Sequence, residues 1–408
     1  MNLLLTSLGG KKINENIIIS GSKSESNRLL LLKALYPEIS LNNVSNSDDS
    51  QLMTKALASS SHIVDIHHAG TAMRFLTAYF SIQEGREVTL TGSKRMKERP
   101  IKVLVEALRK LGAEITYLEN EGYPPLKIVG KKLMGDSLTI DGSVSSQYIS
   151  ALLMIAPKLK HGLSIQFEGE IVSKPYIKMT LEMMQYFGAD IQWEGNTIVV
   201  QPGKYKGKKI TIEADWSAAS YWYSMVALAK KANIVLTDLK KNSWQGDAVV
   251  QEIYKPLGVQ TSFVEEGLQL TKLTAQPKNS VNVIDFVNCP DLSQTVAVTA
   301  AALNIATKLT GLKTLRIKET DRIEALKTEL TKLGFEVDAV NDTIIIHQKR
   351  SIPTAFSEAI TTYDDHRMAM AFAPLGLVNP ITISHENVVK KSYPNFWKDL
   401  ERLGFLRC

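Results

Sequence analysis

The chain repeats one pattern of apolar and polar positions: a stretch with apolar residues three and four positions apart, then a glycine, then a β-like run. Apolar residues at this spacing line one face of an α-helix. A glycine directly after such a stretch is typical of the C′ position, where positive φ ends the helix. The closing glycines are Gly112, Gly188, Gly258, Gly334 and Gly404. Their separations of 76, 70, 76 and 70 residues indicate duplicated units rather than unrelated helix ends.

A second series of helices begins with polar residues and continues as an apolar run. The predicted segments are 21–35, 70–80, 145–156, 215–229, 291–303 and 365–377. In five units the closing glycine follows this opening by 39 to 43 residues. The first unit lacks such a glycine, and we expect its equivalent second helix within 50–66. Strands are predicted at 87–92, 137–142, 197–202 and 381–386.

Six such units divide most simply into three plus three. We therefore expect an α/β (α+β) fold of two similar domains, with the junction near Glu213-Ala214-Asp215. A solenoid of six stacked repeats is the alternative architecture. The polar helix openings differ too much from one another for stacked consensus repeats, which favours two domains.

The composition narrows the class of protein. Hydrophobic residues make up 44% and charged residues 22% of the 408 positions, which is ordinary for a globular protein and excludes a disordered or collagen-like chain. The two cysteines, Cys289 and Cys408, are too few for a disulfide framework or a zinc cluster. No run approaches the roughly 18 apolar residues of a membrane span. We therefore expect a cytoplasmic protein without a membrane partner.

The charge balance bears on the partners. The formal net charge of +6 suits small anionic substrates at least as well as nucleic acid. The basic tract at 204–209 is short and typical of solvated loop lysines. The aromatic tract at 221–223 is more typical of core packing than of base stacking. We expect small-molecule anions as partners and no nucleic acid.

The candidate chemistry lies at the helix openings, because a helix N-terminus presents unpaired N–H groups that bind phosphate or carboxylate. Ser22 and Glu25 have the spacing of a capping box, which places Lys23, Ser24 and Arg28 in or beside the first turn. An ordinary capped helix is the alternative interpretation of this segment.

Two further openings carry polar groups of the same kind. Gly70 allows close backbone approach, and Arg74 supplies a cation one turn later. Ser145, Ser146 and Gln147 offer two hydroxyls and an amide before an apolar run. Plain N-capping is again the alternative.

The segments 318–322 and 364–372 are the most unusual. Glu319 lies between Lys318 and Arg322, where a carboxylate stays ionised unless burial raises its pKa enough for general-acid work. An exposed, charged first turn is the alternative. Arg367 enters an otherwise apolar helix at its first turn, whereas a lone histidine such as His366 is more often structural.

Several common motifs are absent from the sequence. It contains no G-x-S-x-G nucleophile elbow, no G-x-x-x-x-G-K-[ST] phosphate loop and no G-x-G-x-x-G dinucleotide fingerprint. His62, His67 and His68 lack helix-compatible metal spacing with acidic partners. We expect neither a metal nor a cofactor.

Seven segments together resemble one family, the 5-enolpyruvylshikimate-3-phosphate synthases (3-phosphoshikimate 1-carboxyvinyltransferases) of the enolpyruvyl transferases. They are Gly21–Arg28, Ala69–Arg74, Lys97–Pro100, Gly142–Gln147, Val172–Tyr176, Lys318–Arg322 and Asp365–Met370, and they follow one another in family order. The resemblance implies two domains of the inside-out α/β barrel type with a cleft between them, each with three copies of a two-helix and sheet unit. It places the limits at 20–213 and at 1–19 plus 214–408.

The resemblance also implies the reaction: transfer of the enolpyruvyl group of phosphoenolpyruvate to the 5-hydroxyl of shikimate 3-phosphate, with release of phosphate. Shikimate 3-phosphate is expected to contact Lys23, Ser24, Arg28, Ser145, Ser146, Gln147, Ser173, Tyr176, Asp291 and Lys318. Phosphoenolpyruvate is expected to contact Lys23, Gly70, Arg99, Gln147, Arg322, Arg367 and Lys391. By the same resemblance Asp291 is the base for the hydroxyl, Glu319 is the acid for the methylene carbon, and Lys23 joins them in catalysis.

The sequence departs from the family pattern at three positions: His68 stands for an asparagine, Phe75 for a frequent proline, and Thr314, to which no role is assigned, for an asparagine or glutamate. Two rival functions share a related fold. A UDP-N-acetylglucosamine enolpyruvyl transferase usually has Lys-Asn at Lys23-Ser24 and a loop cysteine as acid. An RNA-binding protein like the RNA terminal-phosphate cyclases would need a nucleotide motif that the sequence lacks. We expect a monomer.

Overall fold

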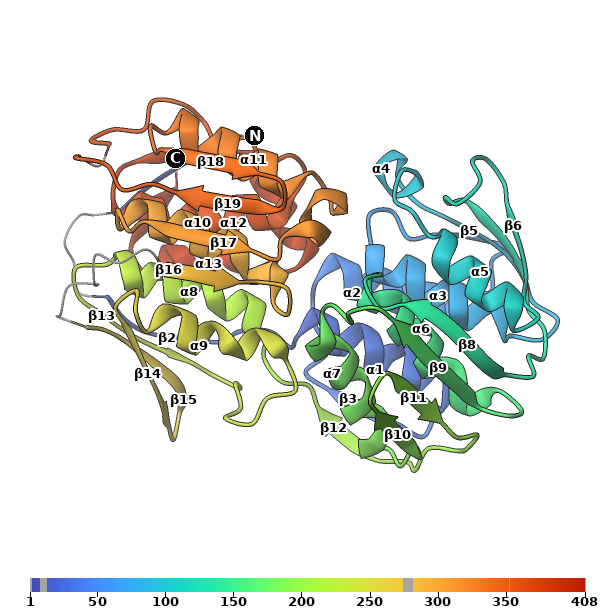
Figure 1. Ribbon diagram of the computed structural model, residues 1–408. Helices are drawn as coiled ribbons and strands as arrows, with labels where there is room; N and C mark the ends of the chain where they lie inside the picture. The colour runs from blue at the N-terminus through green and yellow to red at the C-terminus, as the bar shows by residue number, and fades with distance from the viewer. Residues whose placement is uncertain (1, 8–12, 274–281, 352, 408) are drawn as a thin grey trace. The chain divides into compact units, whose positions relative to one another are not determined.

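The computed structural model describes residues 2–7, 13–273, 282–351 and 353–407. They form two compact units (Figure 1). Unit 1 comprises Met1–Ser20 and Glu213–Cys408, and unit 2 comprises Gly21–Ile212. The domain limits expected from the sequence, with their division of the substrates, stay a prediction.

Unit 2 holds the first three repeats. Its elements are α1 (Lys23–Leu35), β3 (Ser40–Asn42), α2 (Asp48–Ala58), β4 (Ile63–Asp65), α3 (Gly70–Ser81), β5 (Glu87–Thr91), α4 (Lys94–Lys97), α5 (Lys102–Lys110), β6 (Glu114–Tyr117), β7 (Leu126–Val129), β8 (Asp136–Asp141), α6 (Ser146–Ile155), η1 (Ala156–Lys158), β9 (Leu163–Glu168), α7 (Lys174–Tyr186), β10 (Ile191–Glu194), β11 (Thr197–Val200) and β12 (Lys209–Thr211), where η marks a 3₁₀ helix.

Unit 1 holds the other three repeats and the first two strands of the chain. Its elements are β1 (Asn2–Ser7), β2 (Ile13–Ile17), α8 (Trp216–Leu228), β13 (Ala232–Leu236), η2 (Gly246–Val249), α9 (Val250–Tyr254), β14 (Val259–Val264), β15 (Gly267–Lys272), β16 (Asn282–Asp285), η3 (Pro290–Leu292), α10 (Ser293–Ala302), β17 (Thr307–Thr310), η4 (Lys313–Ile317), α11 (Arg322–Lys332), β18 (Val337–Val340), β19 (Thr343–Ile346), α12 (His366–Phe372), η5 (Ala373–Leu377), β20 (Ile381–Ser384), η6 (Glu386–Lys391), α13 (Phe396–Arg402) and β21 (Phe405–Arg407).

Four sheets share one topology. Their strand orders are β4-β5-β7-β6, β8-β9-β11-β10, β2-β13-β15-β14 and β16-β17-β19-β18. In each, the first pair is parallel and the other two pairs are antiparallel. Parallel neighbours need a crossover, and within three of these sheets it is the apolar helix of the repeat: α3, α6 or α10. The shared topology supports the duplication expected from the spacing of the glycines.

Strands distant in sequence complete the remaining repeats. β2 pairs in parallel with β13, and β1 lies between β20 and β21. In unit 2, β12 pairs in parallel with β3. The first repeat therefore has two helices but no closing hairpin, which agrees with its missing glycine.

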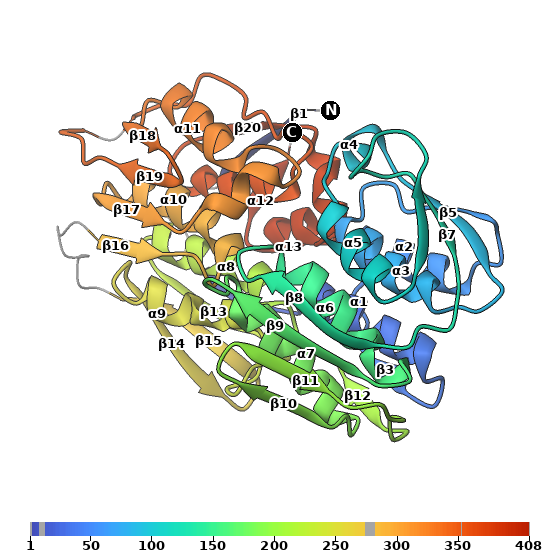
Figure 2. The same cartoon turned by 45° about the vertical axis from the view of Figure 1, so that its right-hand side comes forward.

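The apolar helices form the centre of each unit. In unit 2, α1, α3 and α6 contact one another, and in unit 1, α8, α10 and α12 do the same. α3, α10 and α12 are buried around almost their whole circumference, as expected for helices that are apolar on all sides. The sheets lie outside them (Figures 1 and 2). The first and third repeats of each unit also touch, through α1 and α6 in unit 2 and through α8 and α12 in unit 1. Each unit therefore closes on itself, and the solenoid alternative is wrong.

The helix ends follow the sequence closely. The five closing glycines all adopt positive φ, between 86° and 100°, which confirms their predicted role as helix ends. The predicted strands appear as β5, β8, β11 and β20. One helix is shorter than expected: α12 ends at Phe372 and continues as η5, because Pro374 cannot donate the next helical hydrogen bond.

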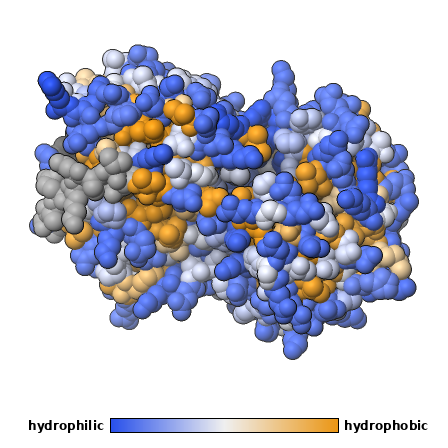
Figure 3. All heavy atoms as spheres, in the orientation of Figure 1, coloured by the Kyte–Doolittle hydropathy of each residue, from blue (hydrophilic) through white to orange (hydrophobic). Residues whose placement is uncertain are grey.

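The apolar side chains distribute as the sequence suggests. Tyr221, Trp222 and Tyr223 are buried in unit 1, which confirms their predicted role in core packing. On the face drawn in Figure 3, hydrophilic residues make up most of the surface. Among the described residues, no helix is both long and apolar enough to cross a bilayer.

Candidate functional site

Arg322 and Asp365 form the most deeply buried ion pair of a charged network in unit 1. Asp365 caps α12 by accepting a hydrogen bond from the backbone N–H of Arg367, at 2.8 Å. Arg322, the first residue of α11, donates from Nε and Nη2 to the two oxygens of Asp365, at 2.6 and 3.3 Å. Arg322 is 2% exposed and Asp365 is fully buried. Such a two-pronged contact fixes the orientation of the guanidinium.

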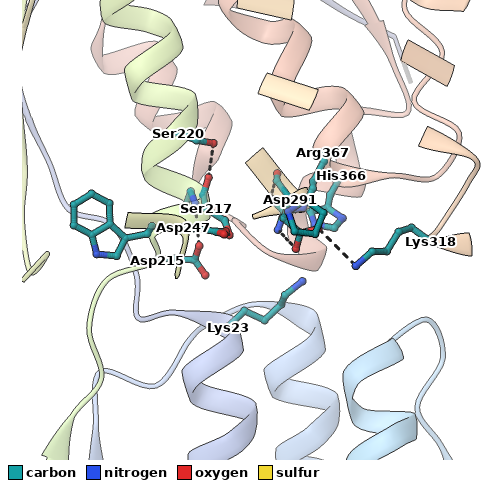
Figure 4. Close-up of polar contacts among 12 residues, drawn as sticks. Lys23, Asp215, Ser217, Ser220, Asp247, Asp291, Lys318, His366 and Arg367 are labelled. Atoms are coloured by element: carbon teal, nitrogen blue, oxygen red, sulfur yellow. Dashed lines mark hydrogen bonds and ion pairs between the residues drawn. The ribbon is translucent and has the colours of Figure 1, made fainter. Parts of the chain in front are cut away.

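Asp291 lies against this network from η3. It accepts from Arg322 Nη1 at 3.1 Å and from Arg367 Nη2 at 2.9 Å, and Lys318 Nζ lies 3.7 Å away. Arg367 also donates to the backbone carbonyl of Asp291 and to the hydroxyl of Tyr221. Arg322 belongs to α11 and Arg367 to α12, and Lys318 precedes α11. Figure 4 shows Arg367 and Lys318 beside Asp291. The predicted base is thus surrounded by predicted substrate-binding cations.

Glu319 also binds the guanidinium of Arg322. Its Oε2 accepts from Arg322 Nη2 at 2.9 Å, and its Oε1 accepts from Lys391 Nζ at 2.5 Å. Burial by itself lowers the pKa of Arg322, but the charges of Asp365, Glu319 and Asp291 outweigh it and raise the pKa overall. One always-charged arginine therefore joins the predicted acid to the predicted base.

In unit 2, two of the predicted helix openings are capped by serines. Ser22 accepts from the backbone N–H of Glu25 at 3.4 Å, and Ser145 accepts from that of Gln147 at 3.3 Å. The side-chain amide of Gln147 donates to Thr71 Oγ1 on α3, at 3.1 Å. The openings of α3 and α6 are therefore joined by a side-chain hydrogen bond, and Ser146 follows Ser145 as the first residue of α6.

Lys23 lies beside a buried carboxylate of unit 2. Its Nζ is 3.6 Å from Asp49 Oδ2, and Asp49 is 2% exposed. His68 Nε2 lies 4.0 Å from the other oxygen of Asp49. The departure from the family pattern at His68 thus places an imidazole next to the carboxylate that holds Lys23. Ser24, the next residue, is half-buried in the first turn of α1.

Arg28 has an enclosed position within unit 2. It donates to Thr180 Oγ1 at 2.7 Å, to Ser150 Oγ at 3.3 Å, and to the carbonyls of Ser24 and Tyr176 at 3.0 and 3.3 Å. Burial lowers its pKa to about 10, so the guanidinium stays charged at neutral pH. These bonds join α1, α6 and α7, and contact with substrate stays a prediction.

Ser173 has unusual backbone geometry. It precedes α7 with φ of 54°, a left-handed conformation that is uncommon outside glycine. Its buried side chain makes no capping bond to the helix, although the position is the N-cap. Strained residues of this kind concentrate at binding sites. Tyr176 follows in the first turn of α7, half-buried.

Gly70 and Arg99 meet at the start of α3. A Cβ at Gly70 would lie 2.4 Å from Arg99 Nη1, so no side chain fits without moving the guanidinium. Arg99 is 8% exposed, and within the described chain its buried Nε has no hydrogen-bond partner. The carbonyl of Pro100 anchors this loop by accepting from Arg74 and Tyr148, at 3.0 and 2.5 Å. The result is a buried cation at a helix N-terminus, an arrangement suited to an anion.

Sequence reasoning missed the carboxylates that hold these cations. Asp49 pairs with Lys23, Asp365 pairs with Arg322, and Asp247 lies near Asp291. Acidic residues are common on surfaces, and only their burial distinguishes these three. The one available signal was for Asp365, which stands at a helix opening with unusual residues.

No group of three or more His, Cys, Asp or Glu residues in the described chain is arranged to hold a metal ion.

Comparison with known proteins agrees with the geometry. The profile of the EPSP synthase (3-phosphoshikimate 1-carboxyvinyltransferase) family matches residues 56–400. A 3-phosphoshikimate 1-carboxyvinyltransferase of Bacteroides fragilis is 50% identical over 397 residues, which cover 97% of this chain and 96% of that protein. One from Vibrio campbellii is 38% identical, covering 96% of this chain and 97% of that protein.

Solved structures support the fold. The structure of an EPSP synthase from Acinetobacter baumannii superimposes with a TM-score of 0.76 at 23% sequence identity, and the match covers 100% of both chains. The repeated topology, the charged helix openings and the near full-length similarity lead to one conclusion: the chain belongs to the EPSP synthase family.

Proposed function

We propose that this protein is a 3-phosphoshikimate 1-carboxyvinyltransferase, an enzyme of the shikimate pathway that supplies aromatic amino acid biosynthesis. It transfers the enolpyruvyl group of phosphoenolpyruvate to the 5-hydroxyl of shikimate 3-phosphate and releases phosphate. The observation that carries the proposal is the bonding of Arg322 to both Asp291 and Glu319. The names of the relatives, at 38% to 50% identity, support the same activity.

The reaction needs an acid and a base close together. Protonation of the methylene carbon of phosphoenolpyruvate by Glu319 makes the neighbouring carbon electrophilic. The 5-hydroxyl then bonds to that carbon and gives its proton to Asp291. Loss of a proton from the new methyl group and departure of phosphate restore the double bond in the product.

The two ion pairs of Glu319 suggest how this residue becomes an acid. Arg322 and Lys391 favour its ionised form, in which it cannot donate a proton. Both cations are also predicted ligands of phosphoenolpyruvate. Binding of that anion would draw them away from Glu319, and loss of their charge raises the pKa of the carboxyl. Substrate binding would thereby favour the protonated form that the first step requires.

The remaining predicted residues bind and orient the two anions. Arg99, Arg322, Arg367 and Lys391 supply the charge to hold phosphoenolpyruvate and the departing phosphate. Ser145, Ser146 and Ser173 offer hydroxyls to the 3-phosphate of the acceptor. Holding two mutually repelling anions in reacting geometry supplies much of the rate enhancement.

Phosphate release gives the direct test. We expect the enzyme to release phosphate from phosphoenolpyruvate only when shikimate 3-phosphate is also present, with no change in rate on addition of a chelator. Turnover with UDP-N-acetylglucosamine would contradict the assignment. That rival reaction also fits poorly with Cys289, whose buried thiol has a pKa raised to about 12 by burial and by nearby carboxylates.

Gly70→Ala is expected to raise the inhibition constant of glyphosate more than the KM for phosphoenolpyruvate. The family is the target of glyphosate, which occupies the phosphoenolpyruvate region and is the longer molecule. The new methyl group would push against Arg99, because a Cβ at position 70 would lie 2.4 Å from the guanidinium. Inhibition assays at several phosphoenolpyruvate concentrations measure both constants. Equal inhibition of the parent and the Gly70→Ala enzyme would show that the space beside Gly70 and Arg99 does not determine how well the inhibitor fits.

We further propose that the enzyme is cytoplasmic and acts as a monomer. Light scattering of the purified protein, with and without both substrates, measures its mass in solution. A stable dimer at assay concentrations would contradict the proposal.

A further inference from the structure

Asp247 is a buried carboxylate next to the network of unit 1 that no step described above uses. It lies in η2, is 3% exposed, and accepts a short hydrogen bond from Ser217 Oγ in the first turn of α8. Figure 4 shows Asp247 beside Ser217 and Asp215, on the side of Asp291 away from Lys318. Asp215, the N-cap of α8, and Asp247 therefore lie together at the N-terminal end of this helix.

The position of Asp247 is fixed by the residue two places before it. Gln245 Oε1 accepts from the backbone N–H of Trp216 at 3.0 Å, and Gln245 Nε2 donates to the carbonyl of Ala214 at 2.9 Å. The segment is thus fastened to the start of α8 by two buried hydrogen bonds. These bonds hold the backbone that carries Asp247 close to the first turn of α8, where Ser217 bonds to its carboxylate.

Some groups around Asp247 raise its pKa and others lower it. Burial, and then the charge of Asp291, raise its pKa from 3.8 to about 6, and Asp215 on α8 adds to this. The hydroxyl of Ser217 and the guanidinium of Arg367 on α12 lower it. A further titratable group is the thiol of Cys289, whose own pKa Asp247 raises. Asp247 is therefore ionised at the neutral pH at which the enzyme would work.

Like charges act on one another reciprocally. Since the charge of Asp291 disfavours ionisation of Asp247, the charge of Asp247 equally disfavours ionisation of Asp291 and makes it a stronger base. Arg322, Arg367 and Lys318 act in the opposite sense: the two arginines bond to Asp291, Lys318 Nζ lies 3.7 Å from it, and all three stabilise its ionised form. A base held only by arginines would accept a proton poorly.

We propose that Asp247 is a positioning residue for the transfer reaction, whose buried negative charge keeps Asp291 basic enough to take the proton of the attacking hydroxyl. This role rests on the proposed function. In this proposal Asp247 acts through Asp291.

The first test is the pH dependence of kcat for Asp247→Asn. The amide keeps the shape and removes the charge. We expect kcat at pH 7.5 to fall about tenfold, and the midpoint of the acid limb to move about one pH unit lower. The KM for shikimate 3-phosphate should change less than about twofold, since the interaction acts on proton transfer.

Two variants sharpen this test. Ser217→Ala removes the donor that stabilises ionised Asp247, so the midpoint should move to higher pH, opposite to Asp247→Asn. Asp399→Asn is the matched control, because Asp399 is another buried carboxylate of unit 1 and is bonded to Tyr393. It should leave the acid limb in place. An acid limb of Asp247→Asn at the parent's position would overturn the proposal.

A second test needs no substrate. The folded protein holds the Asp247 proton to higher pH than the unfolded chain, so the cost of ionising this buried group appears between about pH 4 and pH 6 and is complete above. Asp247→Asn should therefore gain Tm relative to the parent as pH rises from 4.5 to 7.5. A pH-independent Tm difference would show that Asp247 carries no such charge and would overturn the proposal. A parent enzyme that releases no phosphate would instead contradict the proposed function, and with it the role of Asp247, whatever the Tm result.

Discussion

Glu319→Gln is expected to lower kcat by at least about 10²-fold, because the amide nearly preserves the shape of the side chain but cannot donate a proton to the methylene carbon. Glutamine also keeps an acceptor oxygen for Arg322 or Lys391, which both bond to Glu319. Binding of shikimate 3-phosphate should therefore survive largely intact. Steady-state phosphate release measures kcat, and titration calorimetry measures binding.

Glu324→Gln is the matched control for this variant. Glu324 lies in the first turn of α11, five residues after Glu319, and its side chain is exposed. The same chemical change there should alter kcat by less than about twofold, since exposed substitutions outside the site have small effects. A Glu319→Gln protein that binds no shikimate 3-phosphate would place Glu319 in the folding of the site rather than in its chemistry. Asp291→Asn should show a loss of kcat of similar size.

Arg322→Met is expected to destabilise the protein by about 3–5 kcal/mol and to abolish activity, because it leaves Asp365 fully buried without its guanidinium partner. Methionine preserves most of the apolar stem, so the loss reports on the charge rather than on a cavity. Urea unfolding followed by circular dichroism measures the stability. Phosphate release by the same preparation measures the activity.

Arg316→Met supplies the comparison on the same segment. Arg316 bonds to Asp321 and Asp342, but about a third of its side chain is exposed. Pairs of this kind contribute little, so the expected loss is below about 1 kcal/mol. Equal stability losses for the two variants would contradict the view that burial makes the Arg322 network special.

The repeat was predictable from the sequence because its signals are local. A glycine at a helix end needs only its own backbone freedom and the helix before it, and all five closing glycines have the expected positive φ. The apolar runs at 70–80 and 291–303 likewise predicted helices, and α3 and α10 lie there. The end of α12 was missed, although the proline that causes it was visible.

The candidate site was predictable in part. Many of its cations and hydroxyls stand at helix openings, where the unpaired backbone N–H groups of the helix N-terminus bind anions. The buried carboxylates that hold them were missed, because an aspartate in a loop has the same local sequence whether it is exposed or buried. Asp49 and Asp247 became recognisable only through their burial, at 2% and 3% exposure, whereas Asp365, which is fully buried, also stands at a helix opening.

The sequence by itself determined the six repeats, their helices and the family to which the chain belongs, since all of these are written in local periodicity and short motifs. The tertiary structure alone decided which strands complete which sheets. β2 pairs with β13 across more than two hundred residues, and β1 lies between strands from the other end of the chain. Local pattern shows that a strand has an apolar face but not which strand covers its edge. The same holds for Arg322, whose bonds to Asp291, Glu319 and Asp365 depend on three segments meeting at one point.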